Sequence, residues 1–300
     1  MIMKNIFPYI FMMCLSLVFA PSKAQTTEPC ILKVVYEFSH LYNKAEKQVY
    51  NTDMVLRVGK TNAKYNNLKK EYTKPVKSNP IDAAAMAASP KTVVAVGMPM
   101  TVVTPKEDIS ESIYQLPGEK KLVKIDRLGF QDYKMEMPLP VINWKIEKDT
   151  KDIAGIKCQK ASGNFGGRHY TAWFAPSLAM KYGPWKLNGL PGLILEAADT
   201  AKEVVFTCKS VTRLENEDEY ILYESGRKVA IQEADFNKAK TKFDKDPVAM
   251  SQAQLKSGTS VADIIYQDPS TGKALRGREA LDAIKKNSAK VISNPLELKP

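Results

Sequence analysis

The run from 182 to 195 constrains the fold of this chain more than any other stretch. It reads Tyr-Gly-Pro-Trp-Lys-Leu-Asn-Gly-Leu-Pro-Gly-Leu-Ile-Leu and holds three glycines, two prolines and a tryptophan. Leu190-Pro191-Gly192-Leu193 predicts a type II turn, because proline presets φ at the second position and glycine supplies a positive φ at the third. Leu193-Ile194-Leu195 then indicates the start of a buried strand. We therefore expect this stretch to fix the path of the backbone.

Most of the chain alternates apolar and polar residues with the period of two that is typical of half-buried strands. In 30–38, for example, Leu32, Val34, Tyr36 and Phe38 share one side. The same pattern predicts strands at 53–58, 63–66, 122–125, 133–137, 142–146, 153–161, 168–174, 193–197 and 204–211, and a hairpin of 220–223 with 228–231. No helical pattern separates them. We predict an α+β fold with a predominantly antiparallel sheet, curved into a half-barrel or bowl.

The period changes toward the C-terminus, where helices are expected against one face or edge of the sheet. Phe236, Ala239 and Phe243 fall at helical spacing. Asp246-Pro247 predicts the cap and first turn of a second helix, and the spacing after Gly277 indicates a third, short one. These signals identify the last quarter as the helical part of the fold.

The chain divides into three parts. Residues 1–24 form a predicted signal peptide, 25–258 a β-rich domain, and 259–300 a C-terminal extension that ends in a tail from Asn294. A proline-rich stretch from 74 to 105 still contains strand-forming residues, so we interpret it as a surface excursion of the β-rich domain rather than a linker.

The N-terminus has the features of an export signal. Lys4 precedes an almost wholly apolar run, 6–19, and Ser22-Lys23-Ala24 offers small residues at the cleavage positions. We predict cleavage after Ala24 and a location in the periplasm, on the outer membrane or outside the cell. An uncleaved anchor is the alternative, but the run is short for a transmembrane helix. The processed chain is not expected to cross a membrane.

The chain is basic, with a formal net charge of +11. Removal of residues 1–24, which carry Lys4 and Lys23 and no acid, leaves +9. The lysines are scattered, and no zinc finger, basic helix or aromatic-basic motif accompanies them. We therefore expect a solvated surface and no nucleic-acid partner.

Three cysteines remain after export: Cys30, Cys158 and Cys208. Cys158 and Cys208 fall on the apolar sides of predicted strands, so a disulfide between them is one expectation in an oxidising compartment. The alternative is three buried free thiols that behave as small hydrophobic side chains.

Catalytic and metal-binding patterns are largely missing from the sequence. The only histidines, His40 and His169, lie far apart, without a ligand spacing typical of zinc or copper. No nucleophile elbow or phosphate-binding loop occurs. We predict no cofactor, no metal and no catalytic residues. The alternative is an envelope hydrolase that uses His169 with a nearby acid or with Cys158.

One group of residues around the 182–195 run could form a binding surface. Large aromatic side chains beside a shaped turn can make a platform for a sugar or a peptide. The candidates are Arg168, His169, Trp173, Tyr182 and Trp185. The alternative is that the aromatic members pack in the core beneath the turn.

The same run carries a family resemblance. Gly189-Leu190-Pro191-Gly192-Leu193-Ile194 spells the motif that names the GLPGLI family of exported bacterial proteins. The segments 142–146, 153–161, 167–174 and 182–185 also resemble the family pattern, in the same order. The resemblance implies a secreted or periplasmic β-rich protein, with no established activity or cofactor. Some members accompany outer-membrane transport systems.

Together these observations predict a non-enzymatic envelope protein that binds a partner, such as an outer-membrane receptor or transporter. The hydrolase based on His169 is the alternative, and a structural scaffold without a ligand is a third.

Overall fold

The fold is seen in a computed structural model that describes residues 28–68, 100–102, 111–128, 131–214, 220–221, 228–245, 264–267, 273–288 and 294–298. The predicted signal peptide, most of the proline-rich excursion and the helix predicted from Asp246-Pro247 lie outside these residues. No helix within the described ranges is long and apolar enough to cross a membrane.

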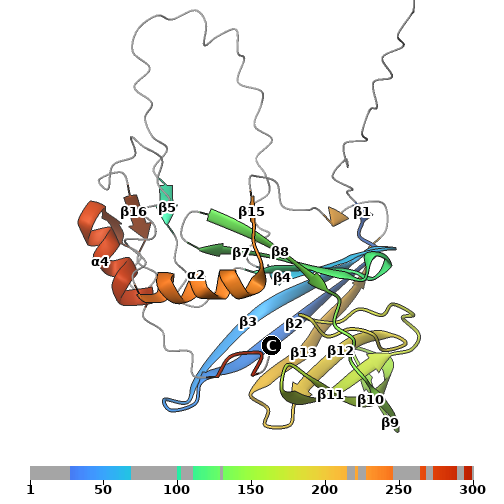
Figure 1. Cartoon of the computed structure of the whole chain (residues 1–300). Helices are drawn as coiled ribbons and strands as arrows, with labels where there is room; N and C mark the ends of the chain where they lie inside the picture. The colour runs from blue at the N-terminus through green and yellow to red at the C-terminus, as the bar shows by residue number, and fades with distance from the viewer. Residues whose placement is uncertain are drawn as a thin grey trace, which may run out of the picture.

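A twelve-stranded open sheet dominates the described part of the chain (Figure 1). Its spatial order is β15 (Lys228–Ala230), β8 (Gln131–Pro138), β7 (Lys121–Leu128), β6 (Ser112–Leu116), β4 (Ala63–Asn67), β3 (Gln48–Val58), β2 (Leu32–Asn43), β13 (Val204–Arg213), β12 (Leu193–Asp199), β11 (Arg168–Ala175), β10 (Ile156–Phe165) and β9 (Lys145–Ile153). Every pair except β15–β8, which is parallel, is antiparallel. A β-rich fold with a mostly antiparallel sheet and few helices is therefore confirmed.

Smaller elements surround this sheet. β1 (Glu28–Pro29) pairs with β14 (Tyr220–Ile221), and β17 (Ala274–Arg276), β16 (Ile264–Gln267) and β5 (Met100–Val102) form a three-stranded sheet. A 3₁₀ turn, η2, spans Pro117–Glu119, and the helices are α2 (Glu233–Lys245) and α4 (Gly277–Ser288).

Helix α2 contains the residues Phe236, Ala239 and Phe243, whose helical spacing in the sequence predicted it. Phe236 is buried and packs with Leu128 and Met135 of the sheet. The first turn carries Glu233 and Asp235 and the last turn carries lysines, which complements the helix dipole. The apolar side of α2 therefore covers the β7–β8 part of the sheet.

The main core lies on one side of the sheet, as the period of two predicts, and a second, smaller cluster that includes Tyr114 and Val123 lies on the other side of β6 and β7. Leu32, Val34, Tyr36 and Phe38 are all buried on the same side of β2. β3 differs, because Val55 and Arg57 on its other side are buried as well. The expectation of one buried and one wet side therefore holds for β2 but not for the end of β3.

Two strand predictions were wrong. Ile142 and Trp144 precede β9, which begins only at Lys145 and continues through a charged stretch. The hairpin of 220–223 with 228–231 does not form, since β14 pairs with β1 and β15 pairs in parallel with β8. β9 forms a local hairpin with β10, whereas β14 and β15 have partners far along the chain. β6 was not predicted at all, although all five of its residues are buried.

Candidate functional site

The 182–195 run lies inside the molecule. It spans the end of the connection between β11 and β12 and the start of β12, and every residue of 182–195 is buried except Gly189 and Pro191, which are exposed. Gln115 of β6 donates from Nε2 to the carbonyls of Gly183 and Trp185, at 2.9 Å each. The Tyr36 hydroxyl donates to the Ile194 carbonyl at 2.6 Å. The connection therefore folds back over the sheet and packs against β6 and β2 on its core side.

The predicted type II turn is not present, and the two glycines of the motif have different roles. Gly189 has φ of +94°, whereas Gly192 is not among the residues with positive φ. The Gly192 amide instead donates to the Leu190 carbonyl at 2.8 Å, which closes a tight turn around Pro191. A Cβ on Gly192 would lie 2.3 Å from the Ala175 carbonyl oxygen. Glycine is needed there for close approach to β11.

Trp185 has a strained backbone that its surroundings hold in place. Its φ is +56°, a conformation that is unfavourable for a bulky residue. The indole is buried and packs edge-on against Phe165, with ring centroids 5.5 Å apart. The bond from Gln115 to the Trp185 carbonyl fixes the peptide on the other side. Burial of the indole and the hydrogen bond from Gln115 therefore offset the backbone strain at Trp185.

Lys186, next in the run, connects three separate parts of the chain. Its ammonium group is buried, forms an ion pair with Glu297 and lies 3.3 Å from Glu233 of α2. Glu233 also faces Lys124 of β7 at 3.7 Å, and Lys124 pairs with Glu111 at 3.4 Å. Burial raises the pKa of Glu111, and Lys124 opposes that shift. These charges hold α2 and the C-terminal residues onto the filled side of the sheet.

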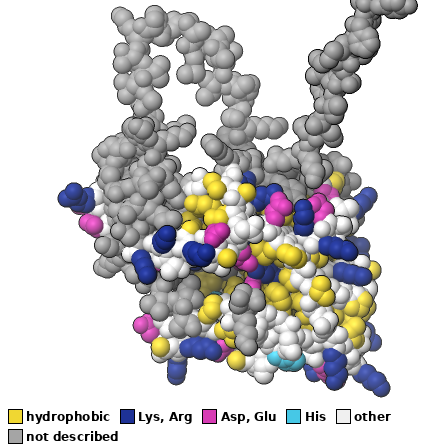
Figure 2. All heavy atoms as spheres, in the orientation of Figure 1, with side chains coloured by type: hydrophobic (Ala, Val, Ile, Leu, Met, Phe, Trp, Pro, Cys, Tyr) yellow, Lys and Arg dark blue, Asp and Glu magenta, His cyan; other side chains and the backbone are white. Residues whose placement is uncertain are grey.

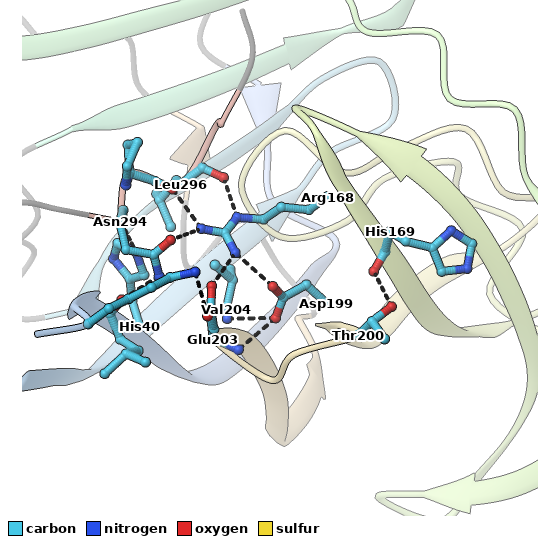
Figure 3. Close-up of polar contacts among 12 residues, drawn as sticks. His40, Arg168, His169, Asp199, Thr200, Glu203, Val204, Asn294 and Leu296 are labelled. Atoms are coloured by element: carbon cyan, nitrogen blue, oxygen red, sulfur yellow. Dashed lines mark hydrogen bonds and ion pairs between the residues drawn. The ribbon is translucent and has the colours of Figure 1, made fainter. Parts of the chain in front are cut away.

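Arg168 is the centre of a second buried cluster (Figure 3). Its guanidinium donates from Nη1 to Asp199 at 2.7 Å and to Glu203 at 3.0 Å. Nη2 donates to the Asn294 side chain at 2.7 Å and to the Pro295 carbonyl at 2.8 Å, and Nε donates to the Leu296 carbonyl at 3.0 Å. A guanidinium has five N–H donors, so all of them are used.

Residues 294–298 therefore form a strap across this end of the sheet. The Asn294 side chain donates to the Leu41 carbonyl at 2.6 Å, and the Leu298 amide donates to Gly166 at 2.7 Å. The sequence suggested only a tail here, in the extension assigned to 259–300. In the structure Asn294 is fully buried and anchors the strap, whereas Pro295 and Leu298 are exposed.

Two titratable groups beside the strap, His40 and Glu203, have shifted pKa values. Burial lowers the pKa of His40 more than its hydrogen bond with the Asn294 carbonyl, 2.8 Å away, raises it. Burial raises the pKa of Glu203, but hydrogen bonds from Lys44 and Arg168 outweigh it, so the net pKa lies below the usual value. The two pKa shifts favour a neutral His40 and an ionised Glu203, so Arg168 is the cation of the cluster.

The structure does not bring the five predicted surface residues together. Arg168, Tyr182 and Trp185 are buried, so they offer no exposed platform. His169 and Trp173 lie on the opposite side of β11, and His169 points away from the Arg168 cluster (Figure 3). Alternation along β11 separates the set: residues 168, 170, 172 and 174 point inward, and 169, 171 and 173 point outward.

Trp173 is the one aromatic candidate that stays half-exposed. The Lys151 ammonium lies 4.6 Å from its ring centroid and also pairs with Glu196. Glu196 is opposite Trp173 in the β11–β12 register. Trp173, Lys151 and Glu196 thus form a mixed aromatic and charged patch, which we call the outer patch.

His169 has an amide as its hydrogen-bond partner. Its Nδ1 lies 2.7 Å from the Asn164 side-chain oxygen, on an exposed part of the β10–β11 hairpin. An amide does not titrate and cannot act as the acid or base that the hydrolase alternative requires. Within the described residues, no group of three or more His, Cys, Asp or Glu side chains could hold a metal ion.

Cys158 and Cys208 are free thiols, as is Cys30, so the predicted disulfide is not formed. β11 and β12 lie between the strands that carry Cys158 and Cys208, whereas disulfide-bonded Cα atoms are about 4.4–6.8 Å apart. Burial, with Glu196 nearby, raises the pKa of both thiols to about 11. The structure therefore agrees with the alternative prediction that the three cysteines are free thiols.

No protein-family model and no curated protein matches the chain. Among solved structures, PNGF-II in the C2 and P21 space groups aligns with TM-scores of 0.46 and 0.46, at 14% and 13% sequence identity, over 70% of this chain. The alignment covers 32% of the PNGF-II chain, so this protein spans about a third of its length. A likeness at this level carries no argument about function.

Proposed function

We propose that this protein is an exported cell-envelope protein that binds a partner without transforming it. The export signal and the resemblance to the GLPGLI family support the location and suggest an outer-membrane receptor or transporter as the class of partner. The single observation that carries the binding role is the division of β11 into an inward side used for packing and an outward side that presents Trp173 and His169.

The packing of the motif supports a structural role for it. Gly192 allows close approach to β11, and Leu190, Leu193 and Ile194 are buried. The Arg168 donors are all used within the chain, so the buried cluster has none left for a ligand. The outer patch then remains as the binding surface, in place of the set predicted from the sequence.

We further propose that the sheet is curved into a bowl whose inner side is filled by the β11–β12 connection. Register shifts in the β9–β10, β11–β12 and β13–β2 pairs support this shape, because β-bulges increase twist and bend strands.

Figure 2 shows lysine and arginine side chains dispersed over the visible face, interspersed with acids. That distribution is compatible with a protein partner.

Site-specific photo-crosslinking in intact cells tests the proposal. A photoreactive residue at Thr171, between His169 and Trp173, is expected to give a discrete adduct in the envelope fraction. Trp173→Ala should abolish that adduct. The matched control is Thr207, an exposed position on β13, where no such adduct is expected.

Two results would overturn the proposal. One is the same set of adducts from Thr171 and Thr207, or none from Thr171, in folded protein. The other concerns location: mass spectrometry of the purified protein should find Gln25 as the first residue, and an uncleaved chain in the cytoplasm would contradict export.

A further inference from the structure

The open edge of the main sheet has an unusual sequence. β9 spans Lys145–Ile153, reads Lys-Ile-Glu-Lys-Asp-Thr-Lys-Asp-Ile and pairs only with β10 in the described part of the structure. It lies at the rim of the sheet (Figure 1). Six of its nine residues are exposed, on both sides of the strand. Its outward backbone groups can therefore accept another strand.

The other edge of the sheet differs. β15 has three residues, and α2 begins three residues after it. Short edge strands and lysines that repel each other are common ways to prevent association of edges. β9 is long and carries three lysines and three acids in alternation, so its charges cancel. The sequence of β9 thus attracts a strand of matching charge pattern rather than repelling all strands.

Symmetry restricts how β9 could pair with a second copy of itself. In a dimer with a two-fold axis perpendicular to the sheet, antiparallel strands place one residue opposite its own copy, and its neighbours pair across the axis. Like charges directly opposite each other are unfavourable. The central residue must therefore be uncharged, which leaves Ile146, Thr150 and Ile153. Only Thr150 allows most of the strand to pair.

The register centred on Thr150 is complementary in charge. Asp149 faces Lys151 of the second copy, Lys148 faces Asp152, and each pair occurs twice. No like charges meet. In the registers centred on Lys148 or Asp149, by contrast, a charged residue faces its own copy.

Contacts within one copy suit this register. Lys148 and Asp152 make no ion pair with any described residue, so the second copy would supply their partners. Lys151 already pairs with Glu196, and Asp149 lies 3.3 Å from Lys160. Pairing would extend these two contacts into a network across the dimer.

We propose that β9 pairs with β9 of a second copy of this chain, antiparallel and centred on Thr150, so that the two sheets become continuous. The interface consists of backbone hydrogen bonds and four ion pairs. Because its side chains are polar, the dimer forms in a concentration-dependent manner and both copies keep their fold when apart.

Disulfide trapping tests the register. In purified protein under mild oxidation, Thr150→Cys should give a covalent dimer, because directly opposite Cα atoms lie about 4.5–5.5 Å apart. Lys148→Cys is the matched control, since its own copy is displaced by four residues, about 13 Å along the strand. Wild-type protein sets the background from the native thiols. Equal trapping of the two variants would overturn the register.

Charge exchange tests the interface itself. Asp152→Lys should raise the dissociation constant measured by sedimentation at least about tenfold, since two attractive pairs become repulsive. The double variant Lys148→Glu with Asp152→Lys should restore it to within about threefold of the wild type. Circular dichroism should show unchanged folding in both. A wild-type protein that remains monomeric at millimolar concentration, or a double variant no better than the single one, would overturn the proposal.

Discussion

The Arg168 cluster and the edge strand β9 differ in how far their charged residues are buried. In the Arg168 cluster the guanidinium and Asp199 are buried and Glu203 is half-buried, and each is matched by partners from the same chain. Along β9, six charged residues face mainly solvent. Buried charges left without partners are costly, whereas exposed ion pairs contribute little to stability. The contrast indicates that the first set maintains the fold and that the second is available for association.

The largest effect is expected from Gly192→Ala, in the segment that fills the sheet. A Cβ there would lie 2.3 Å from a backbone oxygen of β11, so the strand and the connection would have to separate. We expect a loss of more than about 4 kcal/mol in the free energy of unfolding, or failure to fold, measured by urea denaturation. Gly118→Ala is the control, because nothing lies within 4 Å of its added Cβ. Equal stability of the two variants would contradict the role of Gly192.

The second prediction compares the loss of the buried Arg168 charge with the loss of an exposed charge on β9. Arg168→Met would leave the buried Asp199 without its cation, while the half-buried Glu203 would keep its ion pair with Lys44, and the variant should lower the free energy of unfolding by about 3–5 kcal/mol. Lys148→Met on β9 removes a solvent-exposed charge and should change it by less than about 0.5 kcal/mol. If both variants lost the same stability in chemical denaturation, the distinction between the two regions would be wrong.

The smallest effect is a pH dependence at the strap. Burial lowers the pKa of His40 in the folded protein, so the unfolded chain binds the proton more tightly. The contribution is fully present above the unfolded pKa, about 6.5, and is lost as the pH falls below it. His40→Gln keeps a donor for the Asn294 carbonyl and should flatten this part of the stability profile, measured by denaturation across pH. A steeper slope in the variant would contradict the assignment.

Local patterns predicted much of the sheet, because the period of two reports directly on burial. β2 and β11 follow it closely. The local patterns failed at β9, a charged strand with no apolar side for the pattern to detect. They also failed where the partner lies far along the chain, as for β15, which pairs with β8. Pairing of this kind depends on the arrangement of the whole sheet.

The site was harder to predict for the same reason. The turn was correctly located in the 182–195 run, but Gly192 is required by contact with β11 rather than by its own φ. The roles of Gln115 and Asn294 had no local signal beyond the turn-forming Asn294-Pro295 pair. Trp173 and Trp185 look equivalent in sequence, and only the fold separates the half-exposed residue from the buried one.

The strap has a consequence for the order in which the protein can mature. Arg168 takes three of its five acceptors from residues 126 to 128 positions later in the chain. While the ribosome still holds those residues, the guanidinium faces two carboxylates without the three oxygens that complete its set of acceptors. We therefore expect the hydrogen bonding around Arg168 to be completed only late in synthesis, after residue 296 has been released.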